Sequence, residues 1–393
     1  MSISKLKTGY TTGTCAAAAA KHAATSLVLG QAHHGSASTV TLPRGGTYGD
    51  SATLEISNCG FVSTEGRVDG EGAAKSAFAE VVKNAGDDPD VTNGAVIRAE
   101  VFWQDETTLP QIVIQNDTQN IYIEGGIGVG VVTRTGLPVA VGEAAINPVP
   151  RRMIFHEVGE VLQKYKIARA VRVVISVPDG EKIAALTMNP RLGIVGGISI
   201  LGTRGVVIPF SSSAYRASLA VTIRAAAENG LRHLVLTTGG RSEKYAAGLY
   251  PQLDPMSFIE AGEFIGFSLK KCETMHVHKI TLSGMMGKLS KVAAGVLMVH
   301  SSKSPVDFVF LSKIAEEAGA DAALVEKIKT ANTAGEVGEW MNGAGITGFF
   351  DLLTKRCCTV CHDKVQGKLD IETLLFSMDG RLLGRNAMAK SPS

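Results

Sequence analysis

The first strong hydrophobic pattern of the chain is a run of alanines that follows a segment of threonines and glycines. Residues 8–15 read TGYTTGTC, Ala16 to Ala20 come next, and the apolar pattern continues to Gly30. Threonine caps helix starts and glycine ends helices, so a helix is predicted between these two signals. The N–H groups at such a start attract anions. The alternative is a threonine-capped helix that only packs.

The rest of the first half combines short alternating runs with a few helical patterns. Strands are predicted at residues 39–42, 52–58, 95–103, 111–114, 120–123, 131–134, 171–177 and 205–209, and helices at 71–85 and 153–165. This mixture predicts an α+β domain over residues 1–210.

Helices and strands alternate regularly in the second half. The pattern gives a helix at 214–229, a strand at 231–238, a helical region at 255–271 and a strand at 277–283. Helices at 306–317, 321–331 and 335–341 and a hairpin at 372–384, turning at Asp379-Gly380, complete the tail. We therefore predict an α/β domain with a small parallel sheet and a helical tail over residues 211–393.

Composition narrows the function classes. The 393 residues are 45% apolar and 19% charged, enough for two cores, and the net charge of +2 without a long basic run argues against nucleic-acid binding. Between Arg151 and Arg241, ten Arg and three Lys face only five acidic residues. Such a surplus suits carboxylates or phosphates; the alternative is solvated faces paired with acids elsewhere. No segment predicts a membrane span or export, and we expect a cytoplasmic protein.

A glycine-rich turn at Gly126, Gly128 and Gly130 imitates the nucleotide-binding turn of common methyltransferases. That turn opens a helix, whereas residues 131–138 here are β-like and end at Pro138. We therefore predict that the protein is not a Rossmann G-x-G-x-G methyltransferase.

Two other glycine segments each follow a predicted strand. They are Gly239-Gly240-Arg241-Ser242-Glu243 and Gly284-Met285-Met286-Gly287-Lys288. Ligands of parallel sheets bind beyond the carboxyl ends of the strands. The two segments together therefore indicate a small polar ligand, although each alone is also explained as a glycine-assisted turn.

The six cysteines raise the question of metal or nucleophilic chemistry. Cys358 to His362 matches the C-x-x-C-H pattern of haem attachment, but no export signal accompanies it and no second ligand pair for zinc is found. We interpret Cys357, Cys358 and Cys361 as reduced structural thiols and expect no protein-bound metal. Cys15, at a helix start, is either a low-pKa nucleophile or cobalt ligand, or a small residue in a crowded turn.

Several strings in this chain resemble one family, the cobalt-precorrin-5B (carbon 1) methyltransferases of anaerobic cobalamin biosynthesis, the CbiD family. The strings are Thr8 to Ala20, Ile146 to Arg151, Asn189 to Thr203, Thr237 to Glu243, Phe264 to Phe267 and Gly284 to Gly295. The resemblance spans nearly the whole chain. Arg204, where a threonine is expected, and the Cys357 to His362 cluster depart from it.

The resemblance implies a reaction and a division of labour. The reaction is methylation of ring carbon 1 of cobalt-precorrin-5B by S-adenosylmethionine, giving cobalt-precorrin-6A. The α+β domain would bind the corrinoid and the α/β domain the methyl donor. Expected substrate-binding residues are Thr11, Thr12, Thr14, Arg151 and Arg152. Expected cofactor-binding residues are Gly239, Gly240, Arg241, Glu243, Gly284, Gly287 and Lys288. No catalytic residue is identified.

Two rival functions stay open at this point. A non-catalytic corrinoid carrier would use the same anion sites without a methyl donor, and an oxidoreductase would place a nicotinamide at the α/β segments. We expect no nucleic-acid or membrane partner. The sequence does not decide whether chains pair or only meet neighbouring pathway enzymes transiently.

Overall fold

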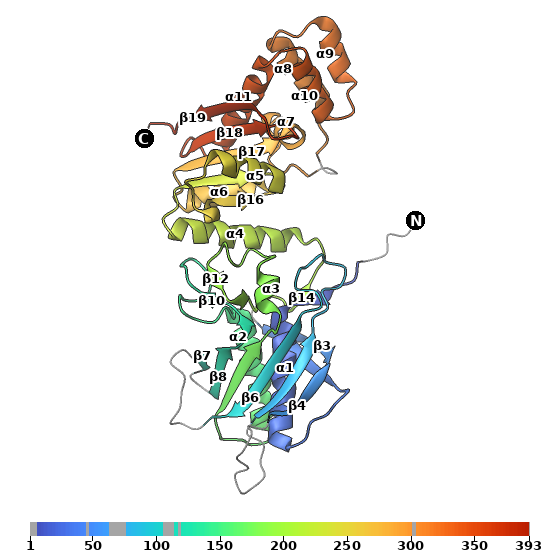
Figure 1. Ribbon diagram of the computed structural model, residues 1–393, viewed down its shortest axis with the longest axis vertical. Helices are drawn as coiled ribbons and strands as arrows, with labels where there is room; N and C mark the ends of the chain where they lie inside the picture. Colours follow the sequence, from blue (N-terminus) through green and yellow to red (C-terminus); the bar gives the residue numbers. More distant parts are fainter. Residues whose placement is uncertain are drawn as a thin grey trace. The chain divides into compact units, whose positions relative to one another are not determined.

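The structure, a computed structural model, describes residues 6–44, 47–62, 76–104, 114–116, 119–300 and 304–392. The chain is a mixed α/β protein that divides into two compact units, Met1–Ser211 and Ser212–Ser393 (Figure 1). Within the described ranges, no helix is both long and apolar enough to cross a membrane.

A six-stranded sheet forms the base of the first unit. Its order is β4 (Asn58–Val62), β5 (Ser76–Val82), β6 (Val96–Trp103), β11 (Val171–Ser176), β8 (Gln119–Gly125) and β7 (Ile114–Asn116), all antiparallel except the β11–β8 pair. Helices α1 (Thr12–Leu29) and α2 (Pro148–Lys164) pack together, and α1 lies on the sheet. The hairpin β2 (Ala37–Arg44) and β3 (Thr47–Glu55) packs on the helices through β2.

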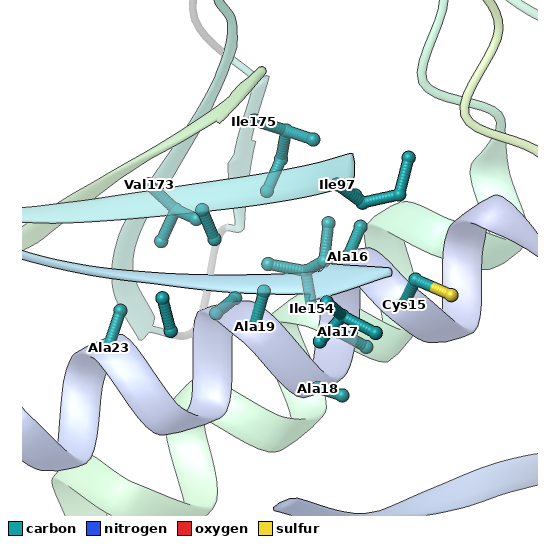
Figure 2. Close-up of a cluster of buried hydrophobic side chains, with 14 of the residues drawn as sticks. Cys15, Ala16, Ala17, Ala18, Ala19, Ala23, Ile97, Ile154, Val173 and Ile175 are labelled. Atoms are coloured by element: carbon teal, nitrogen blue, oxygen red, sulfur yellow. The ribbon is translucent and has the colours of Figure 1, made fainter. Parts of the chain in front are cut away.

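Alanine side chains let α1 lie deep in this unit. Ala16 to Ala20 and Ala23 have no exposed surface and share one buried cluster with Ile97, Val173 and Ile154 of α2 (Figure 2). The helix starts where the sequence predicts it, with the Thr11 hydroxyl accepting from the Thr14 N–H, and ends at Gly30, whose φ of 65° is left-handed.

Glycine-rich segments form small paired strands beside the main sheet. They are β9 (Gly128–Val129) with β13 (Gly197–Ile198), β10 (Val131–Val132) with β12 (Ile194–Val195), and β1 (Gly9–Tyr10) with β14 (Val206–Val207). A short helix, α3 (Gly180–Ala184), packs on β9 and β13. A Cβ on Gly128 would lie 1.8 Å from the Val177 carbonyl oxygen, so this glycine run serves backbone packing and leads into strands rather than a helix.

The second unit contains a five-stranded sheet in the order β16 (Phe258–Glu260), β15 (His233–Thr237), β17 (Lys279–Met285), β18 (Asp370–Phe376), β19 (Leu382–Met388). The first four strands are parallel, and β19 returns from β18 as the predicted hairpin. Helix α5 (Gly240–Leu249) packs against the strands on one face. Helices α7 (Met286–Ala293) and α11 (Gly348–Lys364) pack on the other face, where the Cys358 thiol on α11 reaches Thr373 of β18.

Further helices complete this unit. Helix α4 (Ser212–Glu228) packs on α6 (Ile265–Thr274), and a 3-10 turn, η1 (Pro255–Ser257), precedes β16. Helices α8 (Phe308–Glu317), α9 (Ala322–Lys329) and α10 (Ala334–Gly343) lie before α11. The three predicted tail helices match α8, α9 and α10 closely.

Two sequence predictions of secondary structure are wrong. The helix expected at 71–85 is strand β5 from Ser76 to Val82, because β4 and β6 pair with it on both sides. Its residues 71–75 lie outside the described residues, as does most of the strand expected at 111–114. The helical region expected at 255–271 contains the short strand β16, and its helix begins only at Ile265.

Candidate functional site

The segments after β15 and β17 meet at one edge of the second unit's sheet. The two strands are parallel neighbours, with Thr237 opposite Ser283. The Thr238 N–H donates to the Ser283 carbonyl oxygen over 3.0 Å, and the Lys288 ammonium donates to the Thr238 carbonyl oxygen. The structure thus brings the two predicted cofactor segments into direct contact.

The order of the strands makes this edge a switch point. Numbered along the unit, the strands run 2-1-3-4-5, so β15 and β17 lead into helices on opposite faces. In doubly wound sheets with this order, the crevice between the first and third strands is where ligands bind. Here that position lies between Gly239 and Gly284.

The glycines at this edge fall into two kinds. A Cβ on Gly239, Gly240 or Gly287 would meet no atom within 4 Å, whereas a Cβ on Gly284 would lie 2.9 Å from the Thr238 hydroxyl oxygen. Gly284 is therefore required for packing. The other three leave open space at the starts of α5 and α7, neither of which has a side-chain cap.

Both signs of charge occur at this edge. Arg241 is exposed and Glu243 is half-buried, while Glu260 ends β16 opposite Thr237 and Glu263 follows three residues later. Burial lowers the pKa of the Lys288 ammonium, and the nearby carboxylates of Glu260 and Glu263 oppose part of that shift. Sequence reasoning missed both glutamates because it did not separate β16 from a helix. The short strand Phe258–Glu260 before Ala261-Gly262 is the signal that would have shown them.

In the first unit, the predicted substrate threonines lie at the start of α1 and are buried. The Thr12 hydroxyl accepts from the Leu201 N–H over 2.9 Å, and the Thr14 hydroxyl donates to the Gly205 carbonyl oxygen over 2.6 Å. The Gly13 N–H donates to the Leu201 carbonyl oxygen over 3.0 Å. These groups, with Thr11, hold the 199–205 segment. Their role in substrate binding remains a prediction.

Helix α2 begins at the same place as α1. A Cβ on Gly13 would lie 2.6 Å from Pro150, and the Lys21 ammonium of α1 lies 2.6 Å from the Glu157 carboxylate of α2. The two helices therefore run parallel with their N-termini together, and their dipoles add at this end.

The two predicted arginines on α2 differ in their contacts, because within the described part of the chain one forms an ion pair and the other does not. The Arg151 guanidinium lies 2.7 Å from the Glu143 carboxylate. Arg152 is exposed, and neither a hydrogen bond nor an ion pair of its guanidinium occurs among the described residues. Of the two, Arg152 is the residue able to receive an external carboxylate.

The cysteines are buried and uncharged. Burial raises the pKa of the Cys15 thiol to about 12, which does not favour a nucleophilic thiolate there. Burial also raises the pKa values of Cys357, Cys358 and Cys361 on α11. All six cysteines are free thiols, and the described part of the chain contains no group of three or more His, Cys, Asp or Glu side chains able to hold a metal.

Comparisons with known proteins identify the family. The family model described as CbiD matches residues 2–209, and the one described as the CbiD C-terminal domain matches residues 298–387. The chain is 50% identical over 380 residues to a Geobacillus kaustophilus protein named cobalt-precorrin-5B C(1)-methyltransferase, covering 97% of this chain and 94% of that protein.

More distant relatives have related names. A Leptospira borgpetersenii protein with the same name is 38% identical over 389 residues, covering 98% of this chain and 96% of that protein. The crystal structure of a cobalamin biosynthesis protein (cbiD) from Archaeoglobus fulgidus is 29% identical, covers 74% of this chain and 81% of that one, and has a TM-score of 0.38. This chain belongs to the CbiD family, as its sequence strings predicted.

Proposed function

We propose that this protein methylates ring carbon 1 of cobalt-precorrin-5B with S-adenosylmethionine as methyl donor, in cobalamin biosynthesis. The observation that carries the proposal is the 50% identity, over nearly the whole of both chains, to a protein named for that reaction. The same name favours an enzyme over a non-catalytic corrinoid carrier, and it also argues against a nicotinamide oxidoreductase.

The methyl donor is assigned to the second unit, residues 211–393, at the β15–β17 switch point. Open space at Gly239, Gly240 and Gly287 supports this assignment, as do the uncapped starts of α5 and α7. Arg241 and Lys288 would bind the carboxylate of the donor. Glu243 would accept from its ribose hydroxyls or amino group. Gly284 would keep the two segments in contact.

The corrinoid is assigned to the first unit, residues 1–210, at the end where α1 and α2 begin. The exposed Arg152 and the paired helix N-termini support binding of a molecule that carries carboxylates. Thr11, Thr12 and Thr14 would act here by fixing the 199–205 segment, and Arg151 by fixing the segment around Glu143.

The chemistry makes modest demands on this chain. S-adenosylmethionine supplies a methyl group already activated on a sulfonium. The protein has to align an electron-rich ring carbon in line with that methyl and exclude water, without a strong base. We also propose that the fold is an α+β domain followed by an α/β domain that does not use a Rossmann G-x-G-x-G turn.

Mass analysis of the product tests the reaction. After incubation of the protein with cobalt-precorrin-5B and a donor carrying an isotopically labelled methyl, one labelled methyl should be found on ring carbon 1. Titration calorimetry with S-adenosylhomocysteine tests the donor site, because binding should be lost in Gly240→Asp, which places a carboxylate in the open space. A wild-type protein that binds the corrinoid but neither the donor product nor a methyl donor would support the carrier instead.

A further inference from the structure

The outer face of one small strand pair has an unexpected composition. In β10 and β12, Val132 and Ile194 are opposite each other and are 1% and 6% exposed, packed with Val139 and Ala145. The neighbouring opposite pair, Val131 and Val195, is 43% and 58% exposed. When one face of an antiparallel pair is buried, the other face is ordinarily polar. This pair is apolar on both faces.

Exposed apolar side chains are concentrated in this region. Nine of the nineteen exposed large hydrophobic residues found in the described part of the chain lie between residues 127 and 210, about a fifth of the sequence. Single exposed apolar residues are ordinary, whereas apolar side chains that adjoin one another mark a binding surface. Directly opposite residues of an antiparallel pair have their Cβ atoms about 5 Å apart, so Val131 and Val195 form continuous apolar surface.

Backbone hydrogen bonds connect this pair to Leu201. The Ala145 N–H donates to Gly130 over 2.7 Å, and the Ile200 N–H donates to Ala145 over 2.8 Å. Ala145 therefore lies between two segments. Val131 follows Gly130 on one of them, and Leu201, which is 48% exposed, follows Ile200 on the other. Thr12 and Gly13 hold the Leu201 backbone from both sides. We call Val131, Val195 and Leu201 the apolar platform.

Two unpaired cations lie close to the apolar platform along the backbone. The Asn147 N–H donates to Ile200 over 2.9 Å, and Pro150 and the Leu201 carbonyl oxygen both border Gly13, so α2 starts beside Leu201; Arg152 lies two residues after Pro150 on this helix. Arg204 comes three residues after Leu201. Both arginines are exposed, and over the described ranges neither guanidinium has a hydrogen bond or ion pair. An apolar surface edged by unpaired cations is complementary to a flat apolar ring that carries carboxylates.

We propose that the apolar platform binds the ring of the corrinoid substrate and that Arg152 and Arg204 bind carboxylates at the ring's edge. The inference rests on the proposed function, which supplies a polycarboxylate macrocycle as substrate. Burial of the platform's side chains under the ring removes apolar surface from water, while the arginines keep the carboxylates paired. Arg204, which stands where the family pattern has threonine, would thus bind a carboxylate of the substrate.

Two corrin probes separate the two contributions. Cobyrinic acid carries free side-chain carboxylates, whereas in cobinamide they are amides, and both can be followed by their visible absorption. The test variants are Val131→Ser with Val195→Ser, and Arg152→Gln with Arg204→Gln. Leu29→Ser and Lys164→Gln are matched controls, because both lie at the far ends of their helices, about 25 Å from the helix starts.

The expected pattern is specific to each pair of substitutions. The valine variant should weaken binding of both corrins by about tenfold or more. The arginine variant should weaken cobyrinic acid by a similar factor, remove most of the salt dependence of its binding, and leave cobinamide unchanged. The control variants should bind both probes like the wild type. Unfolding temperatures should stay the same throughout, since all the substituted side chains are exposed.

Other results would overturn the inference. Unchanged corrin binding in both test variants would do so. If light scattering also showed that the variants lose a dimer formed by the wild type, the apolar platform would be an interface between copies of the chain. A wild-type protein that binds neither corrin and transfers no methyl group would instead contradict the proposed function. The two failures are therefore distinguishable.

Discussion

The ammonium of Lys288 donates a hydrogen bond to the carbonyl oxygen of Thr238, joining the segments that follow two neighbouring parallel strands. The lysine comes from the first turn of α7, and the threonine directly precedes Gly239 at the start of α5. One side chain thus ties together the two halves of the proposed donor site.

Replacing Lys288 with Met should reduce the affinity for S-adenosylhomocysteine by about tenfold or more, because a cation beside the donor carboxylate is removed. Calorimetry measures the affinity, and Lys313→Met on the exposed surface of α8 is the matched control. Burial lowers the pKa of Lys288, so wild-type affinity should begin to fall at a lower pH than an ordinary lysine would give. A lower unfolding temperature with unchanged affinity would make Lys288 purely structural.

Replacing Thr12 and Thr14 with Val should destabilise the protein rather than act on substrate alone. Each valine removes a hydroxyl bonded to the 199–205 segment, and loss of one such buried hydrogen bond costs about 1–3 kcal/mol. Thermal unfolding checks this. Thr14→Ser should keep most of the stability that Thr14→Val loses, because serine retains the hydroxyl. An unchanged unfolding temperature with weaker corrin binding would return these threonines to direct substrate contact.

Gly128 and Gly239 should respond oppositely to alanine. At Gly128 the φ is 72° and a Cβ would lie 1.8 Å from the Val177 carbonyl oxygen, which excludes a side chain, so Gly128→Ala should cost on the order of 3 kcal/mol or prevent folding. At Gly239 a Cβ would meet no atom within 4 Å, and the backbone is extended. Gly239→Ala should fold normally but weaken S-adenosylhomocysteine binding. Equal stability of both variants would contradict the described backbone contact.

The buried carboxylate of Glu372 should make the second unit sensitive to acid. Burial alone would raise its pKa, but hydrogen bonds from Lys279, Tyr250, Thr281 and Arg385 lower it to about 2. A lowered carboxyl pKa stabilises the fold above the unfolded-state value, and that stability is lost as the pH falls from about 4.5 to 2. Burial lowers the pKa of His233 from 6.5 to about 4, so the unfolded state binds this proton first and a further loss of stability occurs as the pH falls from about 6.5 to 4.

Glu372→Gln measures the contribution of this carboxylate. At pH 7 the substitution should reduce the free energy of unfolding by an amount on the order of 3 kcal/mol, and the acid-induced loss between pH 4.5 and 2 should become smaller. Denaturant unfolding at several pH values gives both quantities. Glu326→Gln is a suitable control, because that glutamate is exposed on α9. An identical pH profile for wild type and Glu372→Gln would contradict the lowered pKa of Glu372 in the folded protein.

Local signals predicted helix ends better than they predicted the site. The start of α1 and its end at Gly30 follow from capping and from the left-handed conformation that glycine tolerates. Strand β5 was missed because its two alanines and its glutamate also suit a helix, and only pairing with β4 and β6 decides between the two. The three residues of β16 are too few to show a period.

The candidate site depends on relationships that no local pattern contains. The sequence correctly placed the segments at Gly239 and Gly284 together, although only Gly239 follows its strand and Gly284 still lies within β17. Their position at a switch point comes from β16 returning to the far side of β15, which is a property of strand order. In the same way, a threonine at a helix start looks identical whether its hydroxyl binds a ligand or, as with Thr12, the backbone of Leu201.

The alanine run of α1 sets the distance between this helix and the sheet of the first unit. Ala16 to Ala20 have no exposed surface, and because their side chains are single methyl groups the helix lies close to the sheet in this cluster. A leucine at Ala19 would push α1 away from the strands. The start of the helix at Thr12, about 10 Å along the axis, would move with it. The position of the proposed corrinoid site thus depends on the size of alanine side chains that do not line it.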